Sequence, residues 1–388
     1  MSQKLAIGMT CYPTFGGSGI IATELGLALA RRGHIVHFIS SDVPWRFDCY
    51  EKNVFFHEVA AREYPLFDNP YVLALASKMV EVSLRHSLDV LHVHYAVPHS
   101  VAGLLACQVL SGTAGAGHPP PRLISTLHGT DITIVGSDPS FLPLTRYAIE
   151  QSDAVSVPSA FLRRATYDRL QVKESLPIRV IPNFVDTEGF LPGRQAGSAP
   201  PTVLRVVHNS NFRPVKRVDD VVRVFAKVRA HPAMKNKMSE LTLIGDGPER
   251  SRVEHLVQEL GLESSVDFLG NQHRFVEVLQ DSRVFLLCSE TESFGLAALE
   301  ALSCGVPVVA PRVGGLGEVI DDAVNGFLIA PGDLDAMAQA VVSLMVDDVR
   351  HAKMAEAARR ETVRRFQHEP IVDQYEKLYL DVLAAGCH

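Results

Sequence analysis

Cysteine is scarce in this chain, with six residues among 388 and no Cys-x-x-Cys pair. Cys11, Cys107, Cys288 and Cys304 lie in or beside apolar segments, where a free thiol behaves as a small hydrophobic side chain. A disulfide framework is therefore not expected. We predict a protein of a reducing compartment, the cytoplasm.

Long apolar runs and an excess of positive charge are missing as well. No run approaches the about eighteen apolar residues that a membrane-spanning helix needs. The apolar run that ends at Pro13 is too short for the core of a signal peptide and is typical of a first buried strand. A net charge of −7 argues against a nucleic-acid partner and gives no support for stable attachment to an anionic membrane.

The composition, with 47% hydrophobic and 21% charged residues, is that of an ordinary globular protein, and 388 residues are long for a single core. The first half alternates strand-like and helical runs, which predicts an α/β domain whose parallel sheet is covered on both faces. The predicted strands are 5–9, 35–39, 54–58, 90–93, 123–126, 154–157 and 178–181. The predicted helices are 20–32, 71–86, 99–110, 142–151 and 160–170.

A segment rich in Gly, Pro and Ala, 186–202, predicts a linker between two domains, 1–185 and 203–365. A second α/β series follows the linker, and the tail from 334 to 383 is predicted to be helical almost throughout. The predicted strands of this series are 204–208, 241–244, 266–268, 284–287, 306–310 and 326–329. Two such sheets would bind a ligand in the crevice at the carboxyl ends of their strands.

The segment SETESFGLAALEALS holds two carboxylates, Glu292 and Glu300, eight residues apart. Glu300 falls on an apolar helix and Glu292 just before it, where Ser289 or Ser293 could cap the helix. Free amides at the positive helix end would suit a phosphate, and the carboxylates would suit the hydroxyls of a sugar nucleotide. The alternative is a buried helix with a solvated glutamate at each end. The amides in question are those of Phe294, Gly295 and Leu296.

A glycine-rich loop, TCYPTFGGSG, lies between the first strand and the first helix. Gly17 would let the backbone approach a ligand closely, and the helix start would supply amides for a phosphate or a carboxylate. The loop resembles a dinucleotide fingerprint without its G-x-G-x-x-G spacing, and Asp42 is the acid that could contact a ribose. The alternative is a glycine turn without a ligand.

His128, in STLHGTDIT, follows a strand of the first domain, at the edge of the sheet where ligands bind. A lone histidine is more often structural than catalytic, so the prediction depends on this position. Tyr95 and His99 follow the preceding strand and are predicted to line the same cleft. His92 and His94, in LHVHY, are assigned to opposite faces of the sheet as core residues.

A basic turn, NFRPVKRVDD, follows the first strand of the second domain. Its Arg213, Lys216 and Arg217 could balance the charge of a diphosphate leaving group, which a metal would otherwise do. The alternative is a solvated basic turn. LIGDGPE, 243–249, is a further glycine turn that would either meet a nucleotide or pack tightly. No spacing of His, Asp or Glu suggests a metal cage.

With these segments in this order, the chain resembles, over nearly its whole length, the family 4 retaining glycosyltransferases of the GT-B fold. The resemblance rests on the E-x7-E motif at Glu292 and Glu300, the glycine loop, the Lys216 turn and GDGPE. It implies two Rossmann-like domains whose parallel sheets face each other across a deep cleft. A C-terminal helix, 366–388, is expected to pack back on the N-terminal domain.

The resemblance also implies roles for single residues on the donor side. Glu292 would contact hydroxyls of the donor sugar, and Glu300 would contact the ribose. Lys216 and a neighbouring arginine would hold the diphosphate, which Gly17 would approach from the other domain. His128 would orient the donor sugar and support the transition state.

One position departs from the family pattern. Members often carry arginine five residues before the lysine, where this chain has Asn211. Either Asn211 or Arg213 would therefore face the diphosphate beside Lys216.

Four segments, GMTCYPTFGGSGIIATELG, HVHYAVPHS, TLHGTDIT and SNFRPVKRV, resemble the branch of this family that acts in bacillithiol biosynthesis. The branch implies UDP-N-acetylglucosamine as donor, L-malate as acceptor, retention of anomeric configuration and no metal or other cofactor. Arg146 is the expected carboxylate partner, although it could equally be a surface residue. The acceptor-binding candidates are Ser18 with its helix start, Tyr95, Thr126 and Arg146.

Three alternatives stay open. Another acceptor, such as a sugar, an inositol phosphate or a lipid, would keep the same donor site. A UDP-sugar 2-epimerase would share the two-domain shape without needing a second substrate, and a dinucleotide oxidoreductase would explain the glycine loop alone. Whether the chain forms a homodimer is also open.

Overall fold

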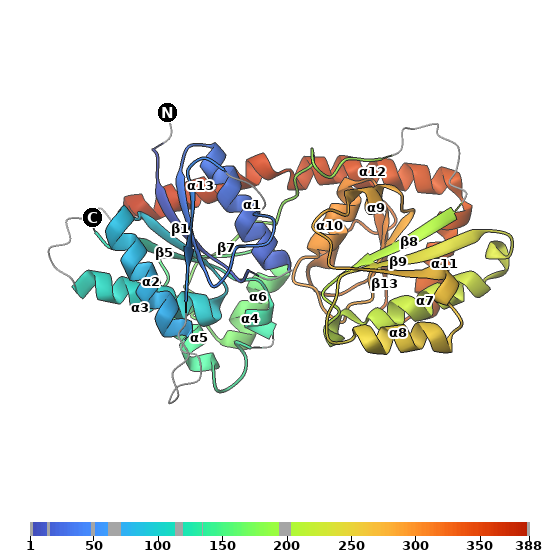
Figure 1. Cartoon of the computed structure of the whole chain (residues 1–388), viewed down its shortest axis with the longest axis horizontal. Coiled ribbons are helices and arrows are strands. Elements are labelled where there is room, and N and C mark those ends of the chain that lie inside the picture. The colour runs from blue at the N-terminus through green and yellow to red at the C-terminus, as the bar shows by residue number, and fades with distance from the viewer. Residues whose placement is uncertain are drawn as a thin grey trace. The chain divides into compact units, whose positions relative to one another are not determined.

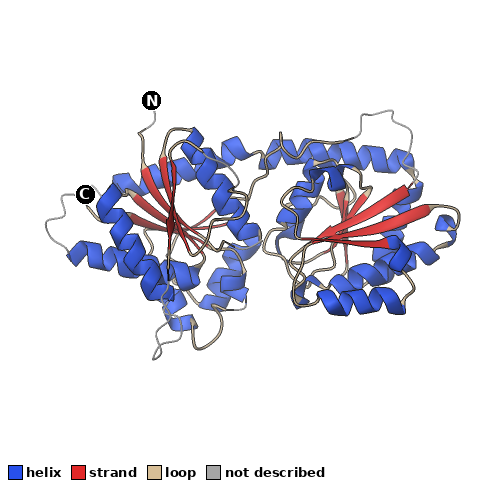
Figure 2. Ribbon diagram, in the orientation of Figure 1, coloured by secondary structure: helices blue, strands red, loops and turns tan. Residues whose placement is uncertain are grey.

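The computed structural model describes residues 3–13, 16–47, 51–60, 71–112, 119–133, 135–193 and 203–385. The chain divides into two compact units, Met1–Pro182 together with Glu369–His388, and Asn183–His368. Figure 1 follows the chain by colour through both units, and Figure 2 shows that helices surround the strands of each. Of the segment expected to be a linker, Phe190 is buried in the core of the second unit. Residues 194–202 lie outside the described residues.

The first unit is built on a seven-stranded sheet with the order β3-β2-β1-β4-β5-β6-β7, and every neighbouring pair is parallel. All seven strands expected in this half are present, as are the five helices. The strands are β1 (Ala6–Thr10), β2 (Ile35–Ser40), β3 (Val54–Glu58), β4 (Val90–His94), β5 (Arg122–Thr126), β6 (Ala154–Val157) and β7 (Ile178–Val180). The helices are α1 (Gly17–Arg31), α2 (Tyr71–His86), α3 (Val101–Gly112), α4 (Thr130–Thr133), α5 (Leu142–Glu150), α6 (Ala160–Leu170) and α13 (His368–Ala385).

Local sequence signals set several of these boundaries. Ser159 caps α6, since its hydroxyl accepts a hydrogen bond from the Leu162 amide at 3.1 Å. Gly33 follows α1 with a φ of +98°, a conformation that glycine adopts without strain. Gly26 brings α1 close to the sheet, because a Cβ atom there would lie 2.4 Å from the Phe38 ring.

The second unit is a six-stranded parallel sheet with the order β10-β9-β8-β11-β12-β13. All six expected strands are present, and the tail is helical as predicted. The strands are β8 (Val203–Asn209), β9 (Met238–Ile244), β10 (Val266–Gly270), β11 (Val284–Leu286), β12 (Val308–Pro311) and β13 (Gly326–Ile329). The helices are α7 (Val218–Ala230), α8 (Arg250–Glu259), α9 (Val276–Gln280), α10 (Leu296–Ser303), α11 (Leu334–Val346) and α12 (Asp348–Phe366).

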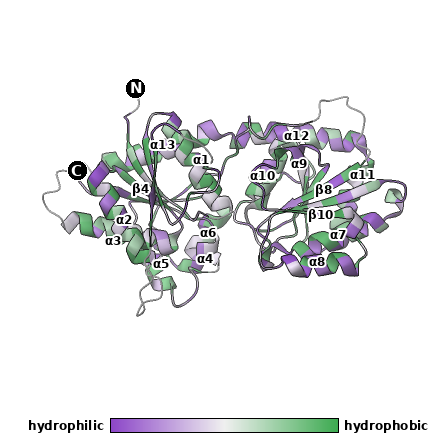
Figure 3. Ribbon diagram, viewed as in Figure 1, coloured by the Kyte–Doolittle hydropathy of each residue, from purple (hydrophilic) through white to green (hydrophobic). Residues whose placement is uncertain are grey.

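Helix α12 shows how these helices pack. Hydrophilic and hydrophobic residues alternate along it in Figure 3, and Met354, Ala358 and Phe366 are buried while the charged residues stay at the surface. Across the described residues, no helix combines the length and the apolar character needed to cross a bilayer.

Strand order reverses once in each sheet. The chain builds β1, β2 and β3 in one direction and then returns to place β4 on the other side of β1. In the second sheet, β8 and β11 are the corresponding pair. The loops that follow such a pair leave toward opposite faces, so a crevice opens at the carboxyl ends of the two strands. Each unit therefore has one preferred place for a ligand.

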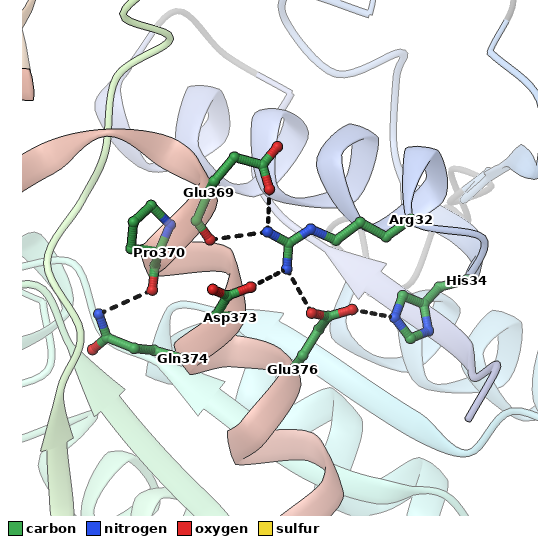
Figure 4. Close-up of polar contacts among 7 residues, drawn as sticks. All are labelled: Arg32, His34, Glu369, Pro370, Asp373, Gln374 and Glu376. Carbon is green, nitrogen blue, oxygen red and sulfur yellow. Dashed lines mark hydrogen bonds and ion pairs between the residues drawn. The ribbon is translucent and has the colours of Figure 1, made fainter. Parts of the chain in front are cut away.

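The C-terminal helix α13 is joined to the first unit by a charged cluster (Figure 4). Arg32, just after α1, contacts the carboxylates of Asp373 at 2.7 Å and Glu376 at 2.5 Å, and also that of Glu369. His34 accepts the Leu5 amide through Nδ1, so its Nε2 carries the proton that it donates to Glu376 at 2.8 Å. These bonds connect α13 with the start of β2.

We expect Arg32→Ala to lower the free energy of unfolding of the first unit by about 1–2 kcal/mol, because three carboxylates lose a shared cation that is 20% exposed. Arg31→Ala is the matched control. The Arg31 side chain is 60% exposed and reaches one carboxylate at 3.4 Å, so its loss should cost less than about 0.5 kcal/mol. Urea unfolding followed by fluorescence of Trp45, the single tryptophan, measures both. Equal effects would contradict the role of the cluster.

Candidate active site

Two predicted residues of the second unit meet at its switch point. Lys216 comes from the loop after β8 and Glu292 from the loop after β11, and Lys216 Nζ lies 2.6 Å from Glu292 Oε1. The Ser289 hydroxyl donates to the same oxygen at 2.8 Å. Glu292 is only 9% exposed, so this ion pair and hydrogen bond hold its carboxylate in one place.

Buried polar groups beneath this pair position the Lys216 turn. His208, on β8, donates from Nδ1 to the Leu286 carbonyl at 2.9 Å and accepts the Ser210 hydroxyl at Nε2. Burial lowers the pKa of His208 to about 4, which keeps the ring neutral at pH 7. The Glu290 amide donates to the Val215 carbonyl at 2.9 Å, so the loops after β8 and β11 are tied together.

The start of α10 differs from the expected serine cap. Gly295 occupies the N-cap position with a φ of +98° and has no side chain with which to cap the helix. The N-cap residue is therefore neither Ser289 nor Ser293. Ser289 donates its hydroxyl to the Glu292 carboxylate. The first amides of α10, including that of Leu296, still have no acceptor within the helix and remain suited to an anion.

Side chains around this helix start are mostly buried. Phe294 is 2% exposed and packs against Phe366, with ring centroids 5.7 Å apart. Glu300 is also 2% exposed, which rules out a solvated glutamate at this end of the helix. The packing of Phe294 against Phe366 fixes the residue just before the N-cap of α10.

A glycine pair that the sequence reading did not single out supports Glu292 from behind. The Gly315 amide donates to the Glu292 carbonyl at 2.8 Å. A Cβ atom at Gly314, whose φ is +56°, would lie 1.9 Å from the same carbonyl oxygen. The adjacent glycines in VGGLGE, directly after a strand, were the signal for this close backbone approach.

The turn LIGDGPE packs against the basic turn. A Cβ atom at Gly245 would lie 1.7 Å from the Ser210 carbonyl, and one at Gly247 would lie 2.1 Å from the Asn211 carbonyl. The Glu249 amide donates to the Phe212 carbonyl at 3.0 Å. Of the two readings for these glycines, tight packing is the one that the structure supports directly.

The three cations of the basic turn have different surroundings. Lys216 pairs with Glu292, and Arg217 pairs with Asp220 at 2.7 Å and with Glu290 at 3.1 Å. Arg213 is exposed and makes no ion pair with any described residue. The Asn211 side-chain oxygen is buried without a hydrogen-bond partner among the described residues. Among these three cations, Arg213 could therefore bind an anion without first breaking an ion pair with a carboxylate.

The corresponding place in the first unit joins two acceptor-binding candidates. Ser18, near the start of α1, donates its hydroxyl to the Tyr95 hydroxyl at 2.9 Å, and Tyr95 directly follows β4. Burial raises the pKa of Tyr95 to about 12, so its phenol stays protonated. The backbone of Tyr95 is strained, with a φ of +88°. Gly17 is exposed as the first residue of α1.

His128 lies beside this pair but bonds to another histidine. Its Nε2 is 2.8 Å from His94 Nδ1, and both rings are buried. Asp131, which the sequence reading did not select, accepts the amides of His128 and Gly129 with one oxygen and that of Ala96 with the other. The aspartate three residues after the histidine in HGTD was the available signal.

His92 and His94 lie on one face of the sheet, with ring centroids 4.5 Å apart, so their assignment to opposite faces was wrong. Side chains in a strand repeat every two residues, which puts these two on the same side. His92 Nε2 is 2.7 Å from the Thr126 hydroxyl and His92 Nδ1 is 2.8 Å from that of Tyr379. Thr126 is thus part of a buried network and is 1% exposed.

Arg146 and Asp42, two further candidates, form hydrogen bonds to other residues of the first unit. The Arg146 guanidinium donates to the Leu170 carbonyl at 2.8 Å and to the Gln171 side chain at 3.3 Å, at the end of α6. The structure does not bring Arg146 into contact with Ser18 or Tyr95. Asp42 is exposed and accepts the amide of the next residue.

Comparison with known proteins agrees with this architecture. A sucrose-phosphate synthase from Thermosynechococcus elongatus superimposes with a TM-score of 0.78 at 23% identity, over 98% of this chain and 100% of that chain. HepE of Anabaena, solved with UDP and glucose, gives a TM-score of 0.77 at 20% identity, over 96% and 99%. The two parallel-sheet units are those of a GT-B glycosyltransferase.

The sequence matches Glycosyltransferase Family 4 over residues 15–189 and Glycosyl transferases group 1 over 194–361. The chain belongs to glycosyltransferase family 4. It is 44% identical to the N-acetyl-alpha-D-glucosaminyl L-malate synthase of Bacillus anthracis over 98% of both chains. A D-inositol 3-phosphate glycosyltransferase of Saccharomonospora viridis is 32% identical over 54% of this chain and 51% of its own length.

Gly314→Ala should displace the Glu292 backbone, because the new methyl group cannot fit 1.9 Å from a carbonyl oxygen. We expect loss of affinity for UDP together with reduced stability. Gly332→Ala is the matched control, since Gly332 has a φ of +81° but no neighbour within 4 Å of a Cβ atom. It should cost only the roughly 1–2 kcal/mol of a left-handed residue. Calorimetric titration with UDP and thermal unfolding measure both variants, and equal UDP affinity would contradict the supporting role of Gly314.

The buried histidines of the first unit should make it labile to acid. Burial lowers the pKa of His92 and His128 to about 3 and that of His94 well below its usual value. In the unfolded chain these rings take up protons below about pH 6.5, whereas in the folded unit they stay neutral. The unfolded state therefore binds more protons, and the free energy of unfolding falls as the pH falls from 6.5 toward 4.

Each such histidine should contribute a slope of about 1.4 kcal/mol per pH unit below pH 6. Urea unfolding at several pH values, followed by Trp45 fluorescence, measures the slope. His94→Asn removes one of the rings and should make the slope shallower by about one proton. An unchanged slope in this variant would show that His94 does not titrate in the assumed way.

Proposed function

We propose that this protein transfers N-acetylglucosamine from UDP-N-acetylglucosamine to the hydroxyl group of L-malate. The observation that carries the proposal is the 44% identity, over 98% of both chains, with the Bacillus anthracis enzyme whose name gives this reaction. The paired Lys216 and Glu292 suit the donor, and the Ser18–Tyr95 pair suits a small polar acceptor. We also propose a cytoplasmic location, because the four described cysteines are free thiols and three of them are buried.

On the donor side, Glu292 is proposed to accept hydrogen bonds from hydroxyls of the sugar. Its Oε1 already accepts from Lys216 and Ser289, so the carboxylate is oriented before the substrate arrives. A diphosphate would compete with Glu292 for Lys216, and the exposed Arg213 would add a second cation. The free amides at the start of α10 supply further donors.

On the acceptor side, L-malate is a dianion and needs hydrogen-bond donors and positive potential. Arg146, the expected carboxylate partner, already donates to the end of α6. We therefore assign the carboxylates of malate to the free amides at the start of α1 and to the hydroxyls of Ser18 and Tyr95.

For the chemical step we propose retention by a front-face route without a metal. The bond from the anomeric carbon to the diphosphate breaks, and the bond to the malate oxygen forms on the same face. The departing diphosphate takes the proton of the malate hydroxyl. Lys216 would stabilise the leaving charge, and His128 would orient the sugar. The neutral state of His128 suits a hydrogen-bonding role rather than that of a cation.

An inositol phosphate is the second acceptor to consider, because a D-inositol 3-phosphate glycosyltransferase is 32% identical over half of this chain. Its match covers 51% of that relative, against 98% for the malate synthase. A UDP-sugar 2-epimerase stays as a third candidate. It would act on the nucleotide sugar without any acceptor.

The release of UDP from UDP-N-acetylglucosamine tests these candidates together. We expect release that requires L-malate, persists in EDTA, and is not supported by D-malate or succinate. Release that needs 1D-myo-inositol 3-phosphate instead would replace the acceptor. Formation of UDP-N-acetylmannosamine without malate would indicate the epimerase, and loss of activity in EDTA would refute the metal-free route.

Lys216→Ala is expected to lower kcat by about 10²–10³-fold, the effect of losing one preorganised group that stabilises charge. Lys227→Ala is the control, since Lys227 forms a surface ion pair with Asp335 and is 44% exposed. It should retain the parent kcat. Turnover of Lys216→Ala at the parent rate with saturating donor would exclude the role assigned to Lys216.

A further inference from the structure

Three histidines of the first unit meet at the edge of its sheet. His37 lies on β2, His57 on the neighbouring β3, and His86 in the last turn of α2. One ring nitrogen from each lies within 4.8 Å of those of the other two, and His37 Nδ1 is 2.9 Å from His57 Nε2. Among the described residues, the ring contacts and hydrogen bonds of these three side chains are with one another and with Phe55, and none involves a residue of the glycosyltransferase site.

Packing holds the three rings in place. The Phe55 ring stacks on His37 at a centroid distance of 5.1 Å and an angle of 18°. His86 continues the buried stripe of α2 that includes Met79 and Val82, so its ring faces the sheet. The ring centroids of His37 and His86 are 4.3 Å apart. Ligands that are fixed before an ion arrives lose little conformational entropy when they bind it.

The protonation state of the cluster favours a cation. Burial, and then the nearness of His86 and His57, lower the pKa of His37 to about 3, and the pKa of His57 is lowered for similar reasons. Lys78 and Arg85 also lower the pKa of His57, whereas Glu81 opposes them. At neutral pH the rings of His37 and His57 are therefore uncharged, and each has one nitrogen with a lone pair for a metal. The proton shared between His37 Nδ1 and His57 Nε2 would move to the other nitrogen of its ring when the ion binds.

Distances and access agree with a metal of the zinc class. Two nitrogens bound to one tetrahedral zinc at about 2.0–2.1 Å are roughly 3.3 Å apart, which falls between the 2.9 Å and 4.8 Å of this cluster. Small rotations of the rings would suffice. His37 is buried, whereas His57 and His86 are half-buried, so an ion can enter from the solvent side.

We propose that His37, His57 and His86 bind a divalent transition-metal ion, with zinc as the best fit and water in the fourth position. Imidazole nitrogens suit zinc, copper and nickel and are poor ligands for magnesium or calcium. The ion would join the end of α2 to the edge strand β3 and to its neighbour β2. Its role would be structural and separate from glycosyl transfer.

Zinc titration of the full-length, untagged, metal-stripped protein against a chromogenic chelator tests the proposal. We expect one tight zinc site per chain. His86→Ala should weaken zinc binding by at least about 100-fold, because loss of a residue that merely orients a metal ligand already costs up to about 100-fold. His255→Ala is the control, because His255 is exposed on α8 of the second unit. It should bind zinc like the parent protein.

Cobalt gives a second readout that does not depend on activity. The parent protein should show the intense visible bands of tetrahedral cobalt, and these should be absent from His86→Ala and His57→Gln. Thermal unfolding without metal checks that both variants fold. The absence of tight binding to the parent, or parent-like affinity in both folded variants, would overturn the proposal.

Discussion

The reversal of strand order in two parallel sheets is the constraint on which the rest of this structure depends. The strands β1 and β4 are neighbours although their first residues, Ala6 and Val90, are 84 positions apart in the sequence. The loops after them therefore meet at one edge, where Ser18 reaches Tyr95. The same reversal between β8 and β11 brings Lys216 to Glu292. An open parallel sheet offers few other places where backbone amides and side chains of distant segments can converge.

This arrangement requires polar groups to be buried below the loops. In the first unit these groups are neutral imidazoles and hydroxyls that are hydrogen-bonded in series, from Tyr379 through His92 to Thr126. Tyr379 belongs to α13, so this C-terminal helix supplies part of the support beneath the sheet edge that carries Ser18 and Tyr95. A charged residue in these positions would carry a large desolvation penalty, whereas the neutral His92 ring is hydrogen-bonded through both nitrogens.

The sequence reading found every strand of both sheets, because buried parallel strands are continuous apolar runs bounded by glycine, proline and charge. It also selected Lys216 and Glu292, which follow strands of one sheet, and the structure brings these two side chains together. It failed where the answer depended on which groups meet. Ser289 bonds a carboxylate rather than capping α10, and Arg146 caps the end of α6. The sequence could have shown that His92 and His94 share a face of the sheet, because side chains two residues apart in a strand lie on the same side.

The sequence alone was therefore enough to predict the succession of strands and helices along the chain and the family. Tertiary structure alone decided the partners of those segments. A side chain at Gly314 would collide with the Glu292 carbonyl, which belongs to a distant loop. His37, His57 and His86 lie together because two strands and the end of a helix meet. Helix and strand periodicity depends on residues that are near in the sequence. Contacts between distant segments depend on the order of strands in the sheet and on how helices pack over it.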